Sequence, residues 1–266
     1  MTDPALPAQM RSRWKAARIL KAMFAAQCLL ALLVVMGDLP KDILSALPRS
    51  EPRSPSTDVP VTPGNQTRQF EPKRLPMEQP SGPGFQSDGF VSPRLEFSRS
   101  GIGGYKDAVL LTGSIAKGDA VRFNDWLKEL ADPPSAFALH SPGGLVNEAL
   151  EIGRTIRGTG VPVMVVSGAS CFSACPYILA GGTAREVSRG AQIGVHQHYF
   201  GENTYLPAFL LVSDIQVGQG RVMDYLAEMG IDPMMMAKAL MTPPDDIYIL
   251  MPEELEDFKL STVLTD

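Results

Sequence analysis

The chain is poor in residues that hold metal ions, and it has no excess of positive charge. Its 266 residues include three cysteines and three histidines, and the net charge is −5. A zinc site needs a second pair of ligands beside Cys171 and Cys175, and the sequence has none at a suitable spacing. His196 and His198 could supply such a pair, which keeps a metal site as a minor alternative. We therefore expect no metal and no other cofactor. Basic residues interleaved with aromatic residues are also missing, which excludes nucleic acid as the expected partner.

The N-terminus combines a basic segment with an uncharged one. Residues 11–21 carry five basic and no acidic side chains, and residues 22–37 carry no charge. Counted from Ile19, the apolar run is about 27 Å long as a helix, which is near the lower limit for crossing a bilayer. A cleaved secretory signal and a buried helix are alternatives, but no small-x-small cleavage site follows and the basic flank is typical of membrane segments.

We therefore predict a cytoplasmic tail over residues 1–18 and a single transmembrane signal-anchor in the inner (cytoplasmic) membrane over residues 19–37. The basic flank places the rest of the chain in the periplasm or cell exterior. Ten prolines fall between Pro48 and Pro93, so residues 38–93 are predicted to be a disordered linker. Folding signals then continue to the end, which predicts one catalytic domain over residues 94–266.

Within this domain, short apolar runs alternate with segments of helical periodicity. The expected strands cover residues 107–115, 135–140, 161–167, 185–188 and 191–196, and the expected helices cover residues 119–130, 145–158 and 173–182. Such alternation predicts an α/β fold with a mostly parallel sheet. In this class, ligands bind at the loops that follow the carboxyl ends of the strands.

Two of these loops contain groups suited to catalysis. Residues 140–144 (HSPGG) include adjacent glycines, whose backbone N–H groups can bind an oxyanion, although a plain turn has the same composition. Residues 167–174 (SGASCFSA) place Ser173 at the start of a helix, where it is either a nucleophile favoured by the helix dipole or an ordinary N-cap.

A base for this serine is available at the end of another expected strand. His196 ends the run IGVH, and His198 follows on the same face of the extended chain. A serine nucleophile needs a base near neutral pKa and an acid that orients the imidazole. Asp245 and Asp246, in the segment PPDDIYILMPEEL, are candidate acids.

The order of these motifs resembles the proteolytic subunit of the Clp protease and its relatives in the ClpP/crotonase superfamily. The matching segments are HSPGG, VPVMVVSGAS, SACPYILAGG and VHQH, within a resemblance of roughly 160 residues. The CFSAC segment, the single anchor and the Pro-rich tether are similar to exported bacterial ClpP-like proteins. The resemblance implies a fold of repeated β-β-α layers and a serine-type peptidase.

Residue by residue, the resemblance implies Ser173 as nucleophile and His196 as base. It assigns the acid to Asp246, six residues before a Pro-Glu pair, and the oxyanion donors to the backbone N–H groups of Gly144 and Ala174. Short peptides or unfolded protein segments are the implied substrates, because an exported domain has no access to a cytoplasmic ATP-driven unfoldase.

Several alternatives stay open beside this assignment. A catalytically silent ClpP-like fold would act as a binding or scaffold module. Related signal peptide peptidases use a Ser-Lys pair, but Lys238 and Lys259 lie outside the expected strand-end loops; related enoyl-CoA hydratases use carboxylates instead. The segment after His198 is only broadly similar to the helix through which Clp subunits pair, so ring assembly is in doubt and a homo-oligomer is an open expectation.

The two cysteines that flank Ser173 also have two interpretations. Cys171 and Cys175 are four residues apart, which permits a disulfide in an oxidising compartment. They are otherwise two small buried thiols at the helix start. If the domain is exported, we expect the pair to be oxidised and to stiffen the nucleophile loop.

Overall fold

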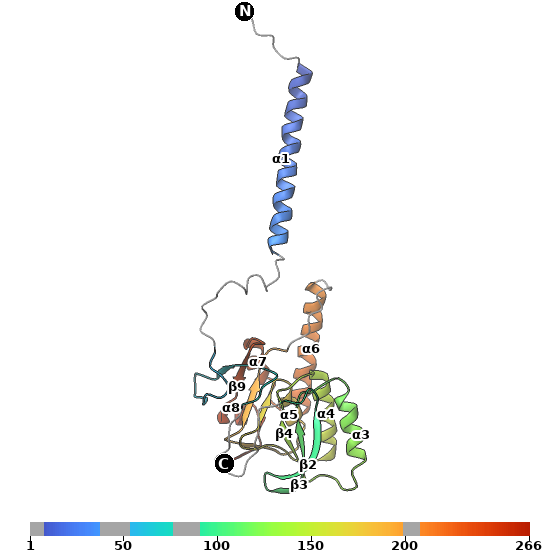
Figure 1. The fold of residues 1–266 in the computed structure, drawn as a ribbon, viewed down its shortest axis with the longest axis vertical. Helices are drawn as coiled ribbons and strands as arrows, with labels where there is room; N and C mark the ends of the chain where they lie inside the picture. The colour runs from blue at the N-terminus through green and yellow to red at the C-terminus, as the bar shows by residue number, and fades with distance from the viewer. Residues whose placement is uncertain (1–7, 38–53, 77–90, 199–207) are drawn as a thin grey trace, which may run out of the picture. The chain divides into compact units, whose positions relative to one another are not determined.

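The computed structural model describes residues 8–37, 54–76, 91–198 and 208–266. The chain divides into two compact units, Met1–Pro52 and Arg53–Asp266 (Figure 1). In the first unit, helix α1 (Ala8–Gly37) contains the whole predicted anchor segment and continues into the basic tail. Within the described ranges, no helix has the length and apolarity that a membrane span requires.

The second unit has a mixed α/β fold built on a larger, mostly parallel sheet. Its strand order is β10-β7-β5-β4-β3-β2, and only the edge strand β2 is antiparallel to its neighbour. The strands are β2 (Glu96–Ile102), β3 (Tyr105–Thr112), β4 (Ala136–His140), β5 (Val163–Val165), β7 (Arg185–Ser188) and β10 (Val263–Thr265). All five side chains of β4 are buried, which explains the apolar run from Ala136 to Leu139 that precedes His140. The predicted α/β class is thus confirmed.

A smaller sheet carries the residues of most interest. Its strand order is β1-β9-β8-β6, with β8 and β6 parallel and the other two pairs antiparallel. The strands are β1 (Thr67–Gln69), β6 (Ser170–Phe172), β8 (Gln192–Val195) and β9 (Asp246–Ile249). A bridge between Ser141 and Cys171 links the end of β4 to β6. The two sheets therefore meet beside the SPGG loop.

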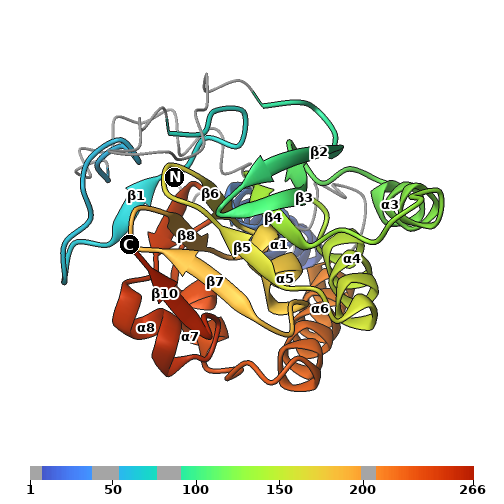
Figure 2. The ribbon, with the colours of Figure 1, turned by 90° about the horizontal axis from the view of Figure 1, so that it is seen from below.

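The predicted helices are present, and others accompany them. The helices of the second unit are α3 (Asp119–Lys128), α4 (Val146–Thr159), α5 (Cys175–Ala180), α6 (Ala208–Glu228), α7 (Met235–Met241) and α8 (Pro252–Asp257). Helices α3, α4 and α6 lie on one side of the larger sheet, and α7 and α8 lie on the side of β10 (Figure 2).

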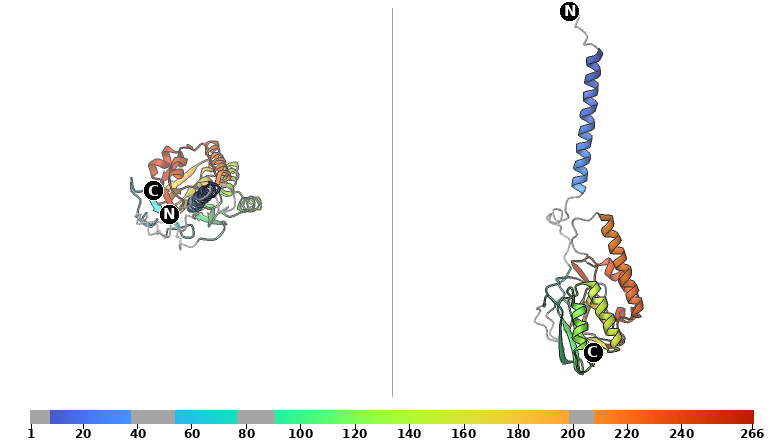
Figure 3. Two further views of the ribbon diagram at one scale, coloured as in Figure 1. Left: turned by 90° about the horizontal axis from the view of Figure 1, so that it is seen from above. Right: turned by 90° about the vertical axis from the view of Figure 1, so that its right-hand side faces the viewer.

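Helix α5 lies in the core between these elements and approaches α4 very closely. A Cβ atom on Gly181 would overlap the backbone of Gly153, so only glycine permits this contact. The Tyr225 hydroxyl of α6 donates a hydrogen bond to the Tyr177 carbonyl of α5 at 2.7 Å. Figure 3 shows α6 running beside α4, where Arg154 and Glu228 form an ion pair of 2.9 Å. These contacts fix the helix that follows the predicted nucleophile.

The predicted linker is wrong for residues 54–76, which we call the strap. Strap strand β1 pairs with β9, and Phe70 and Leu75 of the strap are buried against Phe172 and two isoleucines of β9. The prolines do not prevent this packing, because they flank β1 at Pro63 and Pro72 rather than interrupt it. Residues 38–53 and 77–90 of the predicted linker lie outside the described residues. The strap belongs to the second unit, so the described part of this unit begins at residue 54 rather than at residue 94.

Candidate active site

Ser173 occupies a strained turn between β6 and α5. Its φ is 60°, in the left-handed region that residues other than glycine seldom adopt, and its N–H donates to the Gly194 carbonyl at 2.9 Å. The N-cap of α5 is Ala174, and no side chain caps this helix. The N-cap interpretation of Ser173 is therefore wrong, and its hydroxyl is directed to another partner.

That partner is His196, which follows β8. The Ser173 Oγ lies 2.7 Å from the His196 Nε2, and the His196 Nδ1 lies 3.1 Å from the Pro244 carbonyl oxygen. A carbonyl oxygen only accepts hydrogen bonds, so the neutral imidazole carries its proton on Nδ1. Its Nε2 then has a free lone pair, to which the Ser173 hydroxyl donates. This is the protonation state that a general base requires.

The surroundings of His196 favour its neutral form. The residue is 6% exposed, and its ring stands edge-on to that of Phe70, with centroids 4.8 Å apart. Burial lowers the pKa of His196 from its ordinary value, while the hydrogen bond to Pro244 and the charge of Asp245 act in the opposite direction. The balance keeps the imidazole unprotonated at neutral pH.

The predicted acid, Asp246, is not brought to His196. It is the first residue of β9, paired in register with Gln69 of the strap, and the Nδ1 position is occupied by the Pro244 carbonyl. The nearby negative charge belongs instead to Asp245. The geometry is therefore a Ser-His pair oriented by a backbone carbonyl, which corrects the expected triad.

The predicted oxyanion donors lie around this pair. A parallel bridge joins Ile115 to Gly144: the Ile115 N–H donates to the Gly143 carbonyl, and the Leu145 N–H donates to Ile115. In such a bridge the Gly144 N–H points away from Ile115. Among the described residues, the N–H groups of Gly144 and Ala174 have no hydrogen-bond acceptor. Both are thus available to bind a developing negative charge.

Glycine at position 143 allows this loop to contact the nucleophile. Its φ is 93°, and a Cβ atom there would lie 2.6 Å from the Ser173 Cβ and 2.7 Å from the Ala174 nitrogen. Ser141 supports the loop, because its Oγ accepts a hydrogen bond from the Gly143 N–H and donates one to Gly113. The SPGG loop and the nucleophile turn form one packed unit.

A disulfide joins the two cysteines that flank Ser173. Cys171 is in β6, Cys175 is the first residue of α5, and their Cα atoms are 5.1 Å apart. Both residues are fully buried. The bond closes a short loop around Ser173 and limits the positions that its backbone can take.

The other two histidines have different environments. The Nδ1 of His140 accepts a hydrogen bond from the Ser170 N–H at 3.1 Å, so His140 connects β4 to β6. The Nε2 of His198 lies 2.7 Å from the Tyr177 hydroxyl. Burial, with a smaller contribution from His196, lowers the pKa of His198 to about 4. No three His, Cys, Asp or Glu side chains of the described ranges are grouped so that they could hold a metal ion.

Ser173 and His196 open into a groove with a volume of about 710 Å³. Its walls are largely apolar, with Lys117 and Glu148 among the lining residues; the apolar members are Phe70, Pro72, Ile115, Pro142, Leu145 and Val146. Such a groove can hold an extended chain that presents apolar side chains beside the serine.

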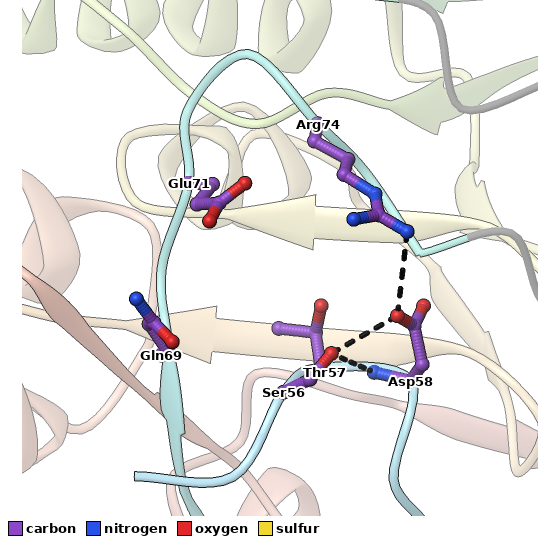
Figure 4. Close-up of a pocket in the computed structure, with 6 residues that line it drawn as sticks. All are labelled: Ser56, Thr57, Asp58, Gln69, Glu71 and Arg74. Atoms are coloured by element: carbon purple, nitrogen blue, oxygen red, sulfur yellow. Dashed lines mark hydrogen bonds and ion pairs between the residues drawn. The ribbon is translucent and has the colours of Figure 1, made fainter. Parts of the chain in front are cut away.

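A second, smaller pocket of about 130 Å³ lies in the strap and is lined by polar side chains (Figure 4). Within it, Ser56 donates a hydrogen bond to Asp58 at 3.0 Å, and Arg74 forms an ion pair with Asp58 at 3.8 Å. These groups satisfy one another at the surface, and neither Ser173 nor His196 is part of this pocket.

Lys238 and Lys259, the two lysines of the Ser-Lys alternative, do not line the groove that contains Ser173. The Lys238 Nζ lies 3.0 Å from both the Tyr248 hydroxyl and Glu254, and these partners raise its pKa. Lys259 follows the C-cap of α8 and has a positive φ of 57°. Neither residue therefore forms a Ser-Lys pair with Ser173; Lys117 lines the groove, but the hydrogen-bond partner of the Ser173 Oγ is the His196 Nε2.

Two groups at the site, the Pro244 carbonyl and Phe70, are not among those predicted from the sequence. A backbone carbonyl has no side-chain signature, although the Pro-Pro pair before Asp245 marks a rigid turn. Phe70 belongs to a proline-free run, residues 64–71, that stands out within the Pro-rich stretch. Comparison of the sequence with protein-family models and with curated proteins gave no match.

Proposed function

We propose that the chain is a serine hydrolase that cleaves peptides or unfolded protein segments. The observation that carries the proposal is the 2.7 Å contact between Ser173 Oγ and His196 Nε2, with the His196 tautomer fixed by Pro244. The strained backbone at Ser173 and the two N–H groups nearby support the same conclusion, because an N-capping serine needs neither.

In the proposed reaction, Ser173 attacks the carbonyl carbon of a peptide bond while His196 takes its hydroxyl proton. The charge that develops on the carbonyl oxygen is stabilised by the N–H groups of Gly144 and Ala174. His196 then transfers its proton to the leaving amine, and an acyl-enzyme forms on Ser173. A water molecule, deprotonated by His196, hydrolyses this ester and restores the serine.

The substrate class and the location follow from other parts of the chain. The apolar groove beside Ser173 favours an extended segment with apolar side chains. The motif order supports a ClpP-like fold within the ClpP/crotonase superfamily, with repeated β-β-α layers. The basic tail and the uncharged run in residues 19–37 support attachment to the inner membrane, with the second unit in the periplasm or cell exterior.

The experiment is cleavage of a fluorescent unfolded casein and of a fluorogenic peptide library by the purified full chain. We expect slow cleavage that is lost in Ser173→Ala and in His196→Ala. The matched control is Ser114→Ala, a serine that lines the same groove, because the hydroxyl that lies at the His196 Nε2 is that of Ser173. Equal cleavage by Ser173→Ala and the unmodified chain would refute the proposal.

A further inference from the structure

The strap holds its own shape through a buried arginine. Arg68 is completely buried, and its guanidinium donates hydrogen bonds to the carbonyls of Val59, Pro60, Asn65 and Thr67 at 2.7–3.3 Å. All of these acceptors lie within the strap. A buried guanidinium whose hydrogen bonds all go to carbonyls of one segment fixes the path of that segment. Any unfolding of the strap would leave some of these N–H groups without an acceptor.

The strap is also joined to the segment that orients His196. Strand β1 of the strap and β9 run antiparallel to each other. Backbone hydrogen bonds flank this pair: the Ile249 N–H donates to the Gln66 carbonyl, and the Phe70 N–H donates to the Asp245 carbonyl at 2.9 Å. The last of these bonds is one peptide away from the Pro244 carbonyl that accepts the His196 Nδ1 proton. Movement of the strap would therefore move the acceptor that sets the His196 tautomer.

Phe70 connects the strap to the imidazole directly. It is 8% exposed, packs edge-on against Phe172 at 6.2 Å and against His196 at 4.8 Å, and lines the groove together with Pro72. The aromatic ring excludes water from one side of the imidazole and limits its rotation. Leu75 belongs to the same apolar cluster but does not line the groove.

We propose that the strap is part of the active site, with Phe70 as a positioning residue for His196 and as one wall of the substrate groove. This inference rests on the proposed hydrolase function. It means that a segment within the predicted Pro-rich linker completes the site in which the serine reacts. The charged and titratable groups that also face the imidazole are Asp245, His198 and, across the groove, Lys117 and Glu148.

The test compares Phe70→Ala with Phe70→Tyr and with the matched control Leu75→Ala in the full chain. The first readout is the rate of fluorophosphonate labelling between pH 5 and 8. We expect Phe70→Ala to slow labelling by up to about 10²-fold, the loss that a misplacement of about 1 Å can cause, and to raise the midpoint of the pH profile because water reaches the imidazole. Phe70→Tyr should restore the rate, and Leu75→Ala should lower the unfolding temperature while it keeps the original midpoint.

The second readout is the pKa of His196 measured by NMR in the Ser173→Ala background, which does not depend on activity. We expect Phe70→Ala to raise this pKa and Leu75→Ala to leave it unchanged. If Phe70→Ala and Leu75→Ala change the midpoint of the labelling profile and the His196 pKa equally, Phe70 has no special role. This conclusion holds even if the unmodified chain is labelled. If the unmodified chain is not labelled but Phe70→Ala raises the His196 pKa, the proposed hydrolase function is refuted, whereas the contact between Phe70 and His196 is supported.

If Phe70→Ala does not fold, Phe70→Leu takes its place, because it keeps part of the apolar volume for folding but leaves space beside the imidazole that the ring filled and that water can enter. A raised His196 midpoint in Phe70→Leu supports the proposal, and an unchanged midpoint contradicts it.

Discussion

The side chains of Ser173 and His196 are oriented by backbone groups. The Gly194 carbonyl holds the Ser173 N–H, and the Pro244 carbonyl holds the His196 Nδ1. A carbonyl provides direction without a full negative charge, so the imidazolium formed during the reaction gains less stabilisation than it would from a carboxylate. Asp245 supplies charge from a greater distance, through its Coulombic effect on His196.

This arrangement gives the adjacent residues Asp245 and Asp246 different expected effects on His196. We expect Asp246→Asn to leave the rate of fluorophosphonate labelling close to that of the unmodified chain, whereas loss of an orienting triad acid lowers activity about 10⁴-fold. Asp245→Asn removes a charge that raises the His196 pKa, so it should move the midpoint of the pH profile to lower pH. Both variants are labelled in parallel. A large loss of labelling rate in Asp246→Asn alone would show that Asp246 is the orienting acid of a Ser-His-Asp triad after all.

Burial of His198 predicts a pH dependence of stability. Its pKa is about 4 in the folded chain and about 6.5 when unfolded, so unfolding takes up a proton between these values. The free energy of unfolding should therefore fall as pH falls below 6.5, by about 2 kcal/mol between pH 7 and pH 5 from this residue. Urea unfolding at the two pH values checks this, with His198→Asn as the comparison; an equal pH dependence in that variant would exclude His198 as the cause.

At the scale of elements, the turn from β6 to α5 is held by the disulfide, by the SPGG loop and by β8. The disulfide is local to the turn, whereas the SPGG loop and β8 come from segments before and after it in the chain. Together they hold Ser173 at a backbone conformation that its own residue type disfavours. The account predicts that changes in these neighbours affect reactivity before they affect the fold.

Gly143→Ala tests the SPGG contact. The new Cβ atom would overlap the Ser173 Cβ and the Ala174 nitrogen, so we expect labelling to fall at least about 10²-fold, the loss typical of a displaced oxyanion donor. Gly158→Ala in α4 is the matched control, because its Cβ would meet nothing within 4 Å and alanine favours helix. Labelling rates and melting curves of both variants decide the question. Unchanged labelling in Gly143→Ala would contradict the close packing.

Loss of the disulfide should weaken both the turn and the fold. A closed loop of about five residues stabilises the folded state by about 2 kcal/mol in the chain-entropy description, which corresponds to about 4–8 °C in melting temperature. We expect the Cys171→Ala, Cys175→Ala double variant to melt lower by this amount and to react more slowly with the probe. Cys28→Ala, which removes the exposed free cysteine, is the control. A double variant that reacts at the original rate would show that the bond does not hold Ser173.

Much of this element order was predictable from the sequence. The runs that became β3, β4, β5, β8, α3 and α4 have clear sequence signals, and the segments after β4, β5 and β8 contain the motifs that identify Gly144, Ser173 and His196. Strand β1 has three residues and pairs with β9, far along the chain, so no local pattern reveals it. Asp246 was the wrong choice of orienting group because the actual acceptor is a main-chain carbonyl.

At the scale of the whole molecule, the folded unit includes part of the segment that composition assigns to a tether. The strap contributes the buried side chains of Arg68, Phe70 and Leu75, and the apolar residues beneath them are Phe172, Ile247 and Ile249. Any boundary placed after the strap exposes this cluster. The Pro-rich composition therefore does not mark where folding begins.

Truncation tests this boundary. A chain that starts at Arg53 should keep the melting temperature of the second unit and the labelling rate of Ser173. A chain that starts at residue 94 loses the strap, and removal of side chains such as Phe70 and Leu75 from an apolar cluster typically costs about 2–5 kcal/mol each. Circular dichroism melts and labelling rates distinguish the two. Equal stability of both truncated chains would refute the inclusion of the strap.

The most direct measurement is fluorophosphonate labelling of the purified full chain, with the adduct located by mass spectrometry. The account predicts one adduct, on Ser173, that is absent in Ser173→Ala, lost or strongly slowed in His196→Ala, and retained in Ser114→Ala. No adduct in a folded, oxidised chain, or an adduct on another serine, would contradict the proposal that Ser173 and His196 form a reactive pair.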